Sequence, residues 1–262
     1  MEFFDNLTSA IPDKYTVKKV SPFSYFIQSK QLKIHFVQIE RYNATIYQNK
    51  IQNLEEKKGH FTTVFEDVFK SNPKKLMERL KYHGGKSYRI HGRETVVKKI
   101  TKLEAIEFLE KNHGNIPLKT KYSFGLLNKR KQLVAIACFG QVIRMRNGAK
   151  SSELIRFCSL SGSRVVGGLT KLIGHFKTLH QLDELMTYCD LEWSNGENFE
   201  KLGFENIETS NPIEFVVNLS SWERMYISKF KKSVDFFDTN RSVFRKVLNR
   251  GSIKFIKYFN EK

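Results

Sequence analysis

The sequence predicts an α/β (α+β) protein in which a mixed central sheet is flanked by helices, with a smaller α/β domain ahead of it. Two observations favour this fold class. Residues 101–218 show, in order, the patterns of a helix, a β-meander, a helix, a strand, a helix and a strand. Residues 1–100 alternate short strands with helices, and a hydrophobic fraction of 40% excludes a wholly disordered chain.

The first hundred residues predict the small α/β domain. Gly59 ends one helical pattern, and Asn72 caps the next, with Pro73 at its first helical position. The first two predicted strands form a hairpin. The predicted strands are 24–28, 33–39, 61–65, 87–90 and 95–100, and the predicted helices are 47–58 and 73–82.

Residues 101–218 predict the central domain. Thr101 and Glu104 form a capping-box pattern at the start of a helix. Leu103, Ile106 and Leu109 recur every three residues, which predicts one buried face. The other predicted elements are strands 122–127, 133–140 and 153–159, helix 163–180, and strands 185–190 and 213–218.

Residues 219–262 predict a basic C-terminal extension. Its predicted elements are helices at 222–232 and 241–248 and a last strand at 251–258. The net charge of +18 lies mainly at the two ends of the chain, with +9 in residues 1–100 and +7 in residues 222–262. Such basic surfaces most often bind nucleic acid, although a basic protein that is merely soluble is the alternative.

The composition also predicts the compartment. Cys138, Cys158 and Cys189 each lie in an apolar strand-like run and form no CxxC pair, so they predict buried thiols in a reducing compartment and no zinc site. No signal peptide and no apolar run long enough to span a bilayer is visible. We therefore expect a cytoplasmic protein without a membrane partner.

The most informative stretch of the chain is residues 185–205. An apolar strand ends at Asp190, a polar turn follows, and a short helix carries Phe199 and stops at Gly203 before another strand. The string NGENFEKLGFE at 195–205 resembles the closing motif of GNAT-type N-acyltransferases. In that family this element lies beside the acyl donor, and its aromatic residue can serve the leaving thiolate. The resemblance implies that Asn198 binds the donor, whereas Phe199 has no proton to give.

A second motif lies at residues 163–168, Ser-Arg-Val-Val-Gly-Gly, after a strand and at the start of a helix. A phosphate-binding loop needs backbone N–H groups and a helix N-terminus. Arg164 and Gly167 match the GNAT signature for this loop, and Leu169 occupies its last small position. The resemblance implies that Arg164, Gly167 and Gly168 bind acyl-CoA or a related acyl donor. The alternative is that the two glycines only pack the helix on the sheet.

Over residues 100–210 the chain resembles the phage Mom-type DNA-modification proteins, a divergent GNAT-like branch. The resemblance depends on EKNH at 110–113, YSFGLL at 122–127, LVAIACFG at 133–140, ELIRFC at 153–158, SRVVGG at 163–168 and TYCD at 187–190. Mom-type proteins modify the exocyclic amine of adenine in DNA. The resemblance implies that His113, Arg156, Ser163 and Asp190 are catalytic, with Asp190 as general base. The structural alternatives are a helix end for His113 and an ion pair of Arg156 with Glu153 or Asp190.

Residues 20–100 resemble, more weakly, Vsr-like and other PD-(D/E)XK nucleases. The residues that carry this resemblance are Glu40, Lys50, Glu66 and Asp67. Because no proline–aspartate pair precedes Glu40, a degenerate domain used for binding is favoured over an active nuclease. A basic stripe with aromatic support then consists of Tyr88, Arg89, His91, Arg93, Lys98 and Lys99, and the alternative is a solvated strand face.

Three functions remain open at this point. The preferred one is a GNAT-like enzyme that transfers an acyl or related group to a nucleobase amine. The second is a metal-dependent nuclease carried by Glu40, Glu66 and Asp67. The third is a non-catalytic nucleic-acid-binding module of phage or mobile-element origin. Three domains are predicted. Residues 1–100 form the small α/β domain with the nuclease-like pattern, residues 101–218 form the transferase core, and residues 219–262 form the basic C-terminal extension.

Overall fold

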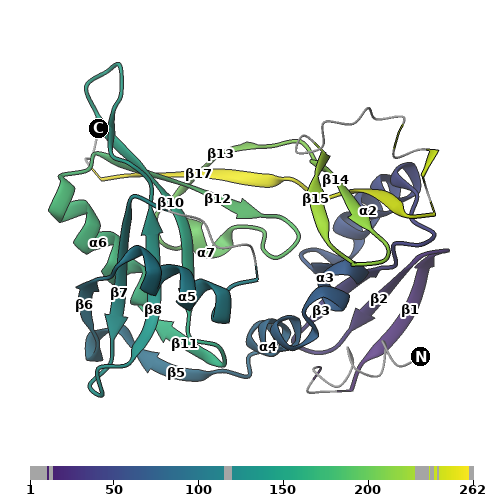
Figure 1. Cartoon of the computed structure of the whole chain (residues 1–262), viewed down its shortest axis with the longest axis horizontal. Coiled ribbons are helices and arrows are strands. Elements are labelled where there is room, and N and C mark those ends of the chain that lie inside the picture. Colours follow the sequence, from purple (N-terminus) through teal and green to yellow (C-terminus); the bar gives the residue numbers. More distant parts are fainter. Residues whose placement is uncertain are drawn as a thin grey trace. The chain divides into compact units, whose positions relative to one another are not determined.

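The computed structural model describes residue 11, residues 14–114, 120–227, 236, 239–240 and 242–259. The chain divides into two compact units that are both discontinuous in sequence (Figure 1). The first unit contains Met1–Met77, Asp190–Asn195 and Thr209–Ser252, and the second contains Glu78–Cys189, Gly196–Glu208 and Ile253–Lys262. Among the described residues, no helix combines the length and the apolar character needed to cross a bilayer.

The first unit contains two small sheets. One has the strand order β1-β2-β3-β4, in which β3 and β4 are parallel and α2 connects them, and the other has the order β15-β14-β16. Its elements are β1 (Thr16–Ser21), β2 (Ser24–Gln28), β3 (Lys33–Val37), α2 (Ala44–Lys58), β4 (Thr62–Phe65), α3 (Glu66–Ser71), the start of α4 (Pro73–His83), β14 (Glu214–Asn218), β15 (Arg224–Tyr226) and β16 (Phe244–Leu248). Its core joins both sheets, because Val217 and Val247 pack in one buried cluster with Phe23, Tyr47 and Phe65.

The second unit contains a mixed sheet with the strand order β13-β17-β12-β10-β8-β7-β6, to which β9 adds beside β10. A separate parallel ribbon joins β11 to β5. The elements are β5 (Tyr88–His91), η1 (Gly92–Glu94), β6 (Val96–Lys99), α5 (Lys102–Asn112), β7 (Tyr122–Leu127), β8 (Leu133–Phe139), β9 (Ile143–Arg144), β10 (Lys150–Ser159), β11 (Ser163–Val166), α6 (Gly168–His180), β12 (Glu184–Asp190), α7 (Glu197–Glu200), β13 (Glu205–Thr209) and β17 (Ser252–Tyr258).

Helices α5 and α6 cover opposite faces of this sheet (Figure 1). Two adjacent residues of β8 show this, because adjacent side chains of a strand point to opposite faces. On one face Phe139 of β8 stacks on Phe176 of α6, with ring centroids 3.9 Å apart. On the other face Cys138 of β8 packs in a buried cluster with Phe108 and Leu109 of α5. The chain is thus an α/β (α+β) protein with a mixed sheet flanked by helices, which confirms the predicted fold class.

Several local predictions are confirmed. The strands predicted at 24–28 and 33–39 form an antiparallel hairpin, Gly59 caps α2, and Thr101 and Glu104 make the reciprocal capping bonds at the start of α5. The last strand is also present as β17.

Four local predictions are wrong. The helix expected from residue 163 is first a strand, β11, and the helix begins only at Gly168. Residues 244–248 form β16 rather than a helix, because they pair with β14. The helix expected at 222–232 is strand β15 at 224–226, and its remainder from 228, like Arg241, lies outside the described residues. Leu103 is 66% exposed, so the buried face of α5 consists instead of Ala105, Phe108 and Leu109.

Candidate functional site

The parallel pairing of β10 with β12 stops part-way along both strands. It runs from Ser151–Glu184 to Leu154–Thr187, where the Thr187 hydroxyl donates a hydrogen bond to the Leu154 carbonyl oxygen (2.9 Å). Beyond this point β10 stays paired with β8 as far as Ser159, after an irregularity in register between Leu154 and Arg156. The main-chain edges of residues 155–159 and 188–189 are therefore not paired with each other.

A left-handed glycine forms the turn that leads from β11 into α6. Gly167 has φ of +73°, and a Cβ at this position would meet no heavy atom within 4 Å. Gly168 is buried and closely packed: a Cβ at this position would lie only 2.8 Å from Val165 Cγ1. Gly167 is therefore open to solvent at the N-terminus of a 13-residue helix, where N–H groups and the helix dipole favour an anion, whereas Gly168 packs the helix.

Arg156 lies on β10 just beyond the point where β12 leaves it. Its register partner is Cys138, and its Nη1 donates to the Ile155 carbonyl oxygen (2.8 Å). Burial raises the pKa of the neighbouring Glu153, and the positive charge of Arg156 opposes that rise. Arg156 is thus a partly buried cation whose guanidinium bonds to the main chain of its own strand.

His113 and Ser163 lie in adjoining segments of the second unit. His113 is the C-cap of α5, and its N–H donates to Leu109 O (2.8 Å). The preceding residue, Asn112, accepts a hydrogen bond at Oδ1 from Ser161 N (2.8 Å), which ties the end of α5 to the turn before Ser163. The Ser163 hydroxyl is buried and donates to Leu160 O (2.8 Å). That bond closes the turn, and it gives the Ser163 side chain a structural partner.

The segment that resembles the GNAT closing motif forms the one-turn helix α7. Asn198 is exposed on it, and Phe199 packs between Phe204 and Phe255, with ring centroids 5.4 and 5.6 Å away. Gly196 before it and Gly203 after it both have positive φ, as the glycine-terminated pattern predicts. Phe199 is therefore a packing residue of the second unit.

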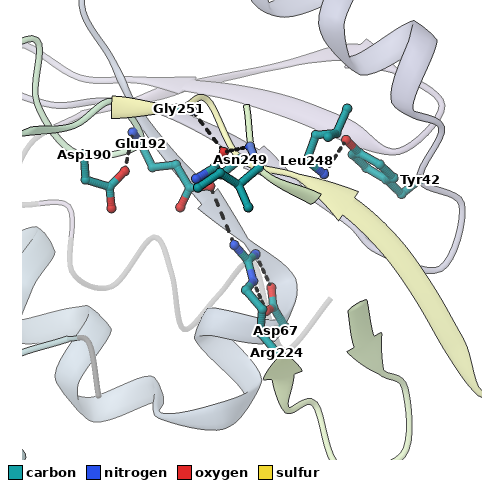
Figure 2. Close-up of polar contacts among 9 residues, drawn as sticks. Tyr42, Asp67, Asp190, Glu192, Arg224, Leu248, Asn249 and Gly251 are labelled. Atoms are coloured by element: carbon teal, nitrogen blue, oxygen red, sulfur yellow. Dashed lines mark hydrogen bonds and ion pairs between the residues drawn. The ribbon is translucent and has the colours of Figure 1, made fainter. Parts of the chain in front are cut away.

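Asp190 is the last residue of β12 and belongs to the first unit. Its Oδ1 accepts a hydrogen bond from Glu192 N (2.9 Å), and its carbonyl oxygen accepts from Trp193 N and Ser194 N (3.0 Å each). Asp190 therefore initiates a tight turn through its side chain (Figure 2). Within the described residues its Oδ2 makes no hydrogen bond or ion pair.

A buried charge cluster that was not predicted from the sequence lies beside this turn in the first unit. Arg224 donates from Nε to Asp67 Oδ2 (2.7 Å) and from Nη2 to Asp67 Oδ1 (2.9 Å), and its Nη1 lies 3.6 Å from Glu192 Oε1 (Figure 2). The guanidinium also lies over the Phe65 ring, 4.6 Å from its centroid. Burial alone would lower the pKa of Arg224, but the negative charges of Asp67 and Glu192 outweigh it and raise that pKa.

Glu192 is the weakly partnered acid of this cluster. It is 7% exposed, and its Oε1 makes no hydrogen bond within the described part of the chain. Burial raises the pKa of Glu192 to about 8, even though Arg224 acts in the opposite direction. Its place between Leu191 and Trp193 is the one sequence signal that an acid is buried here.

The residues expected to carry nuclease chemistry are otherwise engaged. Asp67 is held by Arg224, and Glu66 accepts at Oε2 a hydrogen bond from Ile39 N (3.0 Å). Glu40 is exposed. Across the described ranges, no group of three or more His, Cys, Asp or Glu side chains is placed to hold a metal ion. The described residues thus offer this function no support.

Comparison with known proteins finds only distant structural likeness. No protein-family model matches the sequence, and no curated protein matches it. Among solved structures, the ribosomal-protein-S18-alanine N-acetyltransferase from Escherichia coli is similar at 11% identity and a TM-score of 0.40, over 64% of this chain and 96% of that chain. The spermidine/spermine N-acetyltransferase from Vibrio cholerae is similar at 10% identity and a TM-score of 0.39, over 64% of this chain and 94% of that chain. A histone acetyltransferase-related protein from Corynebacterium glutamicum is similar at 11% identity and a TM-score of 0.39, over 64% and 98%. These values are too low to assign an activity.

Proposed function

We propose that the second unit is a GNAT-like transferase core that moves an acyl or related group from a thioester donor to an amine. The observation that carries this proposal is the parting of β10 from β12 after Leu154 and Thr187. Two parallel strands that separate leave main-chain N–H and C=O groups facing each other without a partner strand. An extended ligand that carries amides can pair with such edges, as a peptide does when it adds to a sheet.

Acyl-CoA fits this arrangement as the donor. Its pantetheine arm is extended and contains amides, which match the edges of residues 155–159 and 188–189. Its pyrophosphate suits the open turn at Gly167 and the N-terminus of α6, with Arg164 and Asn198 as further donor contacts. Gly168 contributes through its backbone, because its Cα is packed against Val165.

The chemistry requires a base rather than a metal-bound water. The amine nitrogen attacks the thioester carbonyl carbon, a C–N bond forms, and the C–S bond breaks to release the thiolate. We assign Asp190, which ends β12 directly after Cys189 of the second unit, as the group that takes or orients the amine proton. His113, Arg156 and Ser163 are candidate supporting residues, of which Arg156 carries the charge suited to a developing oxyanion.

We further propose that the acceptor is a nucleobase amine, as in the Mom-type proteins that the sequence resembles. The positively charged ends of the chain support a polyanionic substrate. A base within a duplex has to leave the helical stack to be reached. The protein would then act as a DNA-modification enzyme in a cytoplasmic compartment, with an origin in phage or another mobile element.

The test is mass spectrometry of nucleosides from cells with and without the intact gene. We expect one nucleoside of increased mass that depends on the gene. Calorimetric titration of the purified chain with CoA tests the donor separately. An unchanged nucleoside profile together with no CoA binding would remove the transferase assignment.

A further inference from the structure

We propose that the exposed face of the β5–β11 ribbon binds the phosphodiester backbone of nucleic acid. This inference rests on the nucleic-acid substrate of the proposed function and names the surface that holds it. We define the ribbon face by four residues: Arg89 and His91 of β5 and Arg164 and Val166 of β11.

The register of the ribbon places these four side chains on one side. Arg164 is the register partner of Arg89, and Val166 is the register partner of His91. Partners in parallel strands point to the same face, and alternate residues of a strand share that face. All four are exposed, whereas Val165 on the opposite face is 6% exposed. The ribbon therefore has an open basic side, and its other side is buried at Val165.

Two arginines side by side on an open face are unfavourable without an anion. Neighbouring strands lie about 4.8 Å apart, and like charges directly opposite each other destabilise a sheet. In the described part of the chain, the side chains of Arg89 and Arg164 make no hydrogen bond or ion pair, although their main chains pair in the ribbon, and Arg93 in η1 is exposed as well. Arginine forks match phosphate oxygens in pairs, so a phosphate between the two side chains would relieve this repulsion.

The ribbon is held in place before any ligand arrives. Tyr88 N donates to Gly162 O (2.8 Å), which fixes the start of β5 against the turn before β11. At the other end, Gly92 packs so closely that a Cβ would lie 2.9 Å from Val166 O. The Lys171 ammonium of α6 donates to Gly92 O (3.0 Å) and to Thr95 O. The arginines therefore project from a rigid element, which lowers the entropic cost of binding.

The shape of the face favours a nucleic-acid chain over a single small anion. Arg89 and His91 are two residues apart, which is roughly 7 Å along the strand. Phosphates repeat at about 3.4 Å of axis along each strand of a duplex, so several of them meet this face.

The experiment compares two double variants of the whole chain with equal charge loss. One is Arg89→Ser with Arg164→Ser, and the control is Arg144→Ser with Arg146→Ser on the exposed hairpin that joins β8 to β10. Binding of a fluorescein-labelled single-stranded DNA of about 20 nucleotides is measured by anisotropy at several salt concentrations, without any acyl donor. We expect the ribbon variant to bind about tenfold more weakly, with a salt slope smaller by about 1.4, and the control to change by less than about twofold.

Each outcome bears on the proposal. Wild-type affinity in the ribbon variant, or equal losses in both variants, would overturn it. Because Arg164 is also the proposed donor contact, a parallel calorimetric titration with CoA separates the two sources of phosphate: loss of CoA binding with DNA binding intact would assign Arg164 to the donor and overturn the proposal. If the ribbon variant loses DNA binding and native cells contain no modified nucleoside, the surface stands and the proposed function fails. If the double variant does not fold, the single variant Arg89→Ser is measured instead, and it is expected to show about half the change in salt slope.

Discussion

Arg224 holds Asp67 by two hydrogen bonds, from Nε to Oδ2 (2.7 Å) and from Nη2 to Oδ1 (2.9 Å), across 157 residues of sequence. The contact joins β15 to α3 within the first unit, and the Asp67 side chain is 2% exposed. A charge at this depth is tolerable only while its partner is present. The pair therefore couples the chain's late strands to its early helices.

Arg224→Met is expected to destabilise the first unit by about 3–5 kcal/mol, because it leaves the Asp67 carboxylate buried and unpaired. Both tryptophans, Trp193 and Trp222, belong to this unit, so urea unfolding followed by tryptophan fluorescence reports on it directly. The control is Lys58→Ala in the same unit, which removes an exposed hydrogen bond from Lys58 Nζ to Gln28 Oε1 (3.4 Å). It should cost less than about 1 kcal/mol. Equal effects from both variants would contradict the prediction.

Glu192 is expected to weaken the first unit as pH rises. Burial raises its pKa from 4.5 to about 8, so the folded protein binds this proton more tightly than the unfolded chain. The associated stability is fully present below pH 4.5 and is lost as pH rises through 8, at about 1.4 kcal/mol per pH unit. Glu192→Gln should remove this slope. Urea unfolding at a series of pH values checks it, and an unchanged profile in the variant would exclude Glu192 as the source.

His35 is expected to make the first unit more stable as pH rises, which is the opposite of the effect of Glu192. It is fully buried, with Phe61 and Tyr47 against its ring, and both ring nitrogens lack a hydrogen-bond partner in the described structure. Burial, and then the positive charge of Arg250, lowers its pKa from 6.5 to about 3. The contribution of His35 to folding stability is fully present above pH 6.5 and is lost as pH falls towards 3.

The His35 and Glu192 contributions therefore oppose each other between pH 4.5 and 6.5. In this window the native protein should show a nearly flat stability profile. Glu192→Gln should then reveal a stability that rises with pH, and His35→Phe should reveal one that falls with pH. A His35→Phe variant with a flat profile would show that His35 is not the titrating group.

The parts of this fold that the sequence predicts are those set by neighbouring residues. The capping box at Thr101 and Glu104 is local, and so is the glycine that ends α2 at Gly59. The prediction of a helix over residues 244–248 was wrong because their apolar spacing also suits a helix. The pairing with β14 that makes them a strand involves residues remote in sequence. Tertiary pairing decides such short apolar runs, not propensity.

The candidate site shows the same division. The glycine-rich loop at 163–168 was expected from its residues, but the helix start predicted at 163 was wrong, because the structure places the left-handed Gly167 just before the helix. The contact between Asp67 and Arg224 has no local pattern, and neither does the end of pairing at Leu154 and Thr187. Strand register depends on side chains that meet only in the fold, so the parting of β10 and β12 was beyond prediction from sequence.

The last prediction concerns Asp190, whose proposed role as base rests on the proposed function. Asp190→Asn keeps an oxygen that accepts the hydrogen bond from Glu192 N, whereas Asp190→Ala removes it. We expect both variants to lose nucleoside modification, measured by mass spectrometry. Asp190→Ala should also lose about 1 kcal/mol of stability, which Asp190→Asn should retain.

A second readout of the same variants separates catalysis from structure. The negative charge of Asp190 helps to raise the pKa of Glu192, so Asp190→Asn should shift the alkaline loss of stability to lower pH. This shift is expected whether or not Asp190 is catalytic, and it shows that the variant folds with the turn intact. An Asp190→Asn protein that shows the shift and still modifies nucleosides at the native rate would remove Asp190 from the catalytic residues.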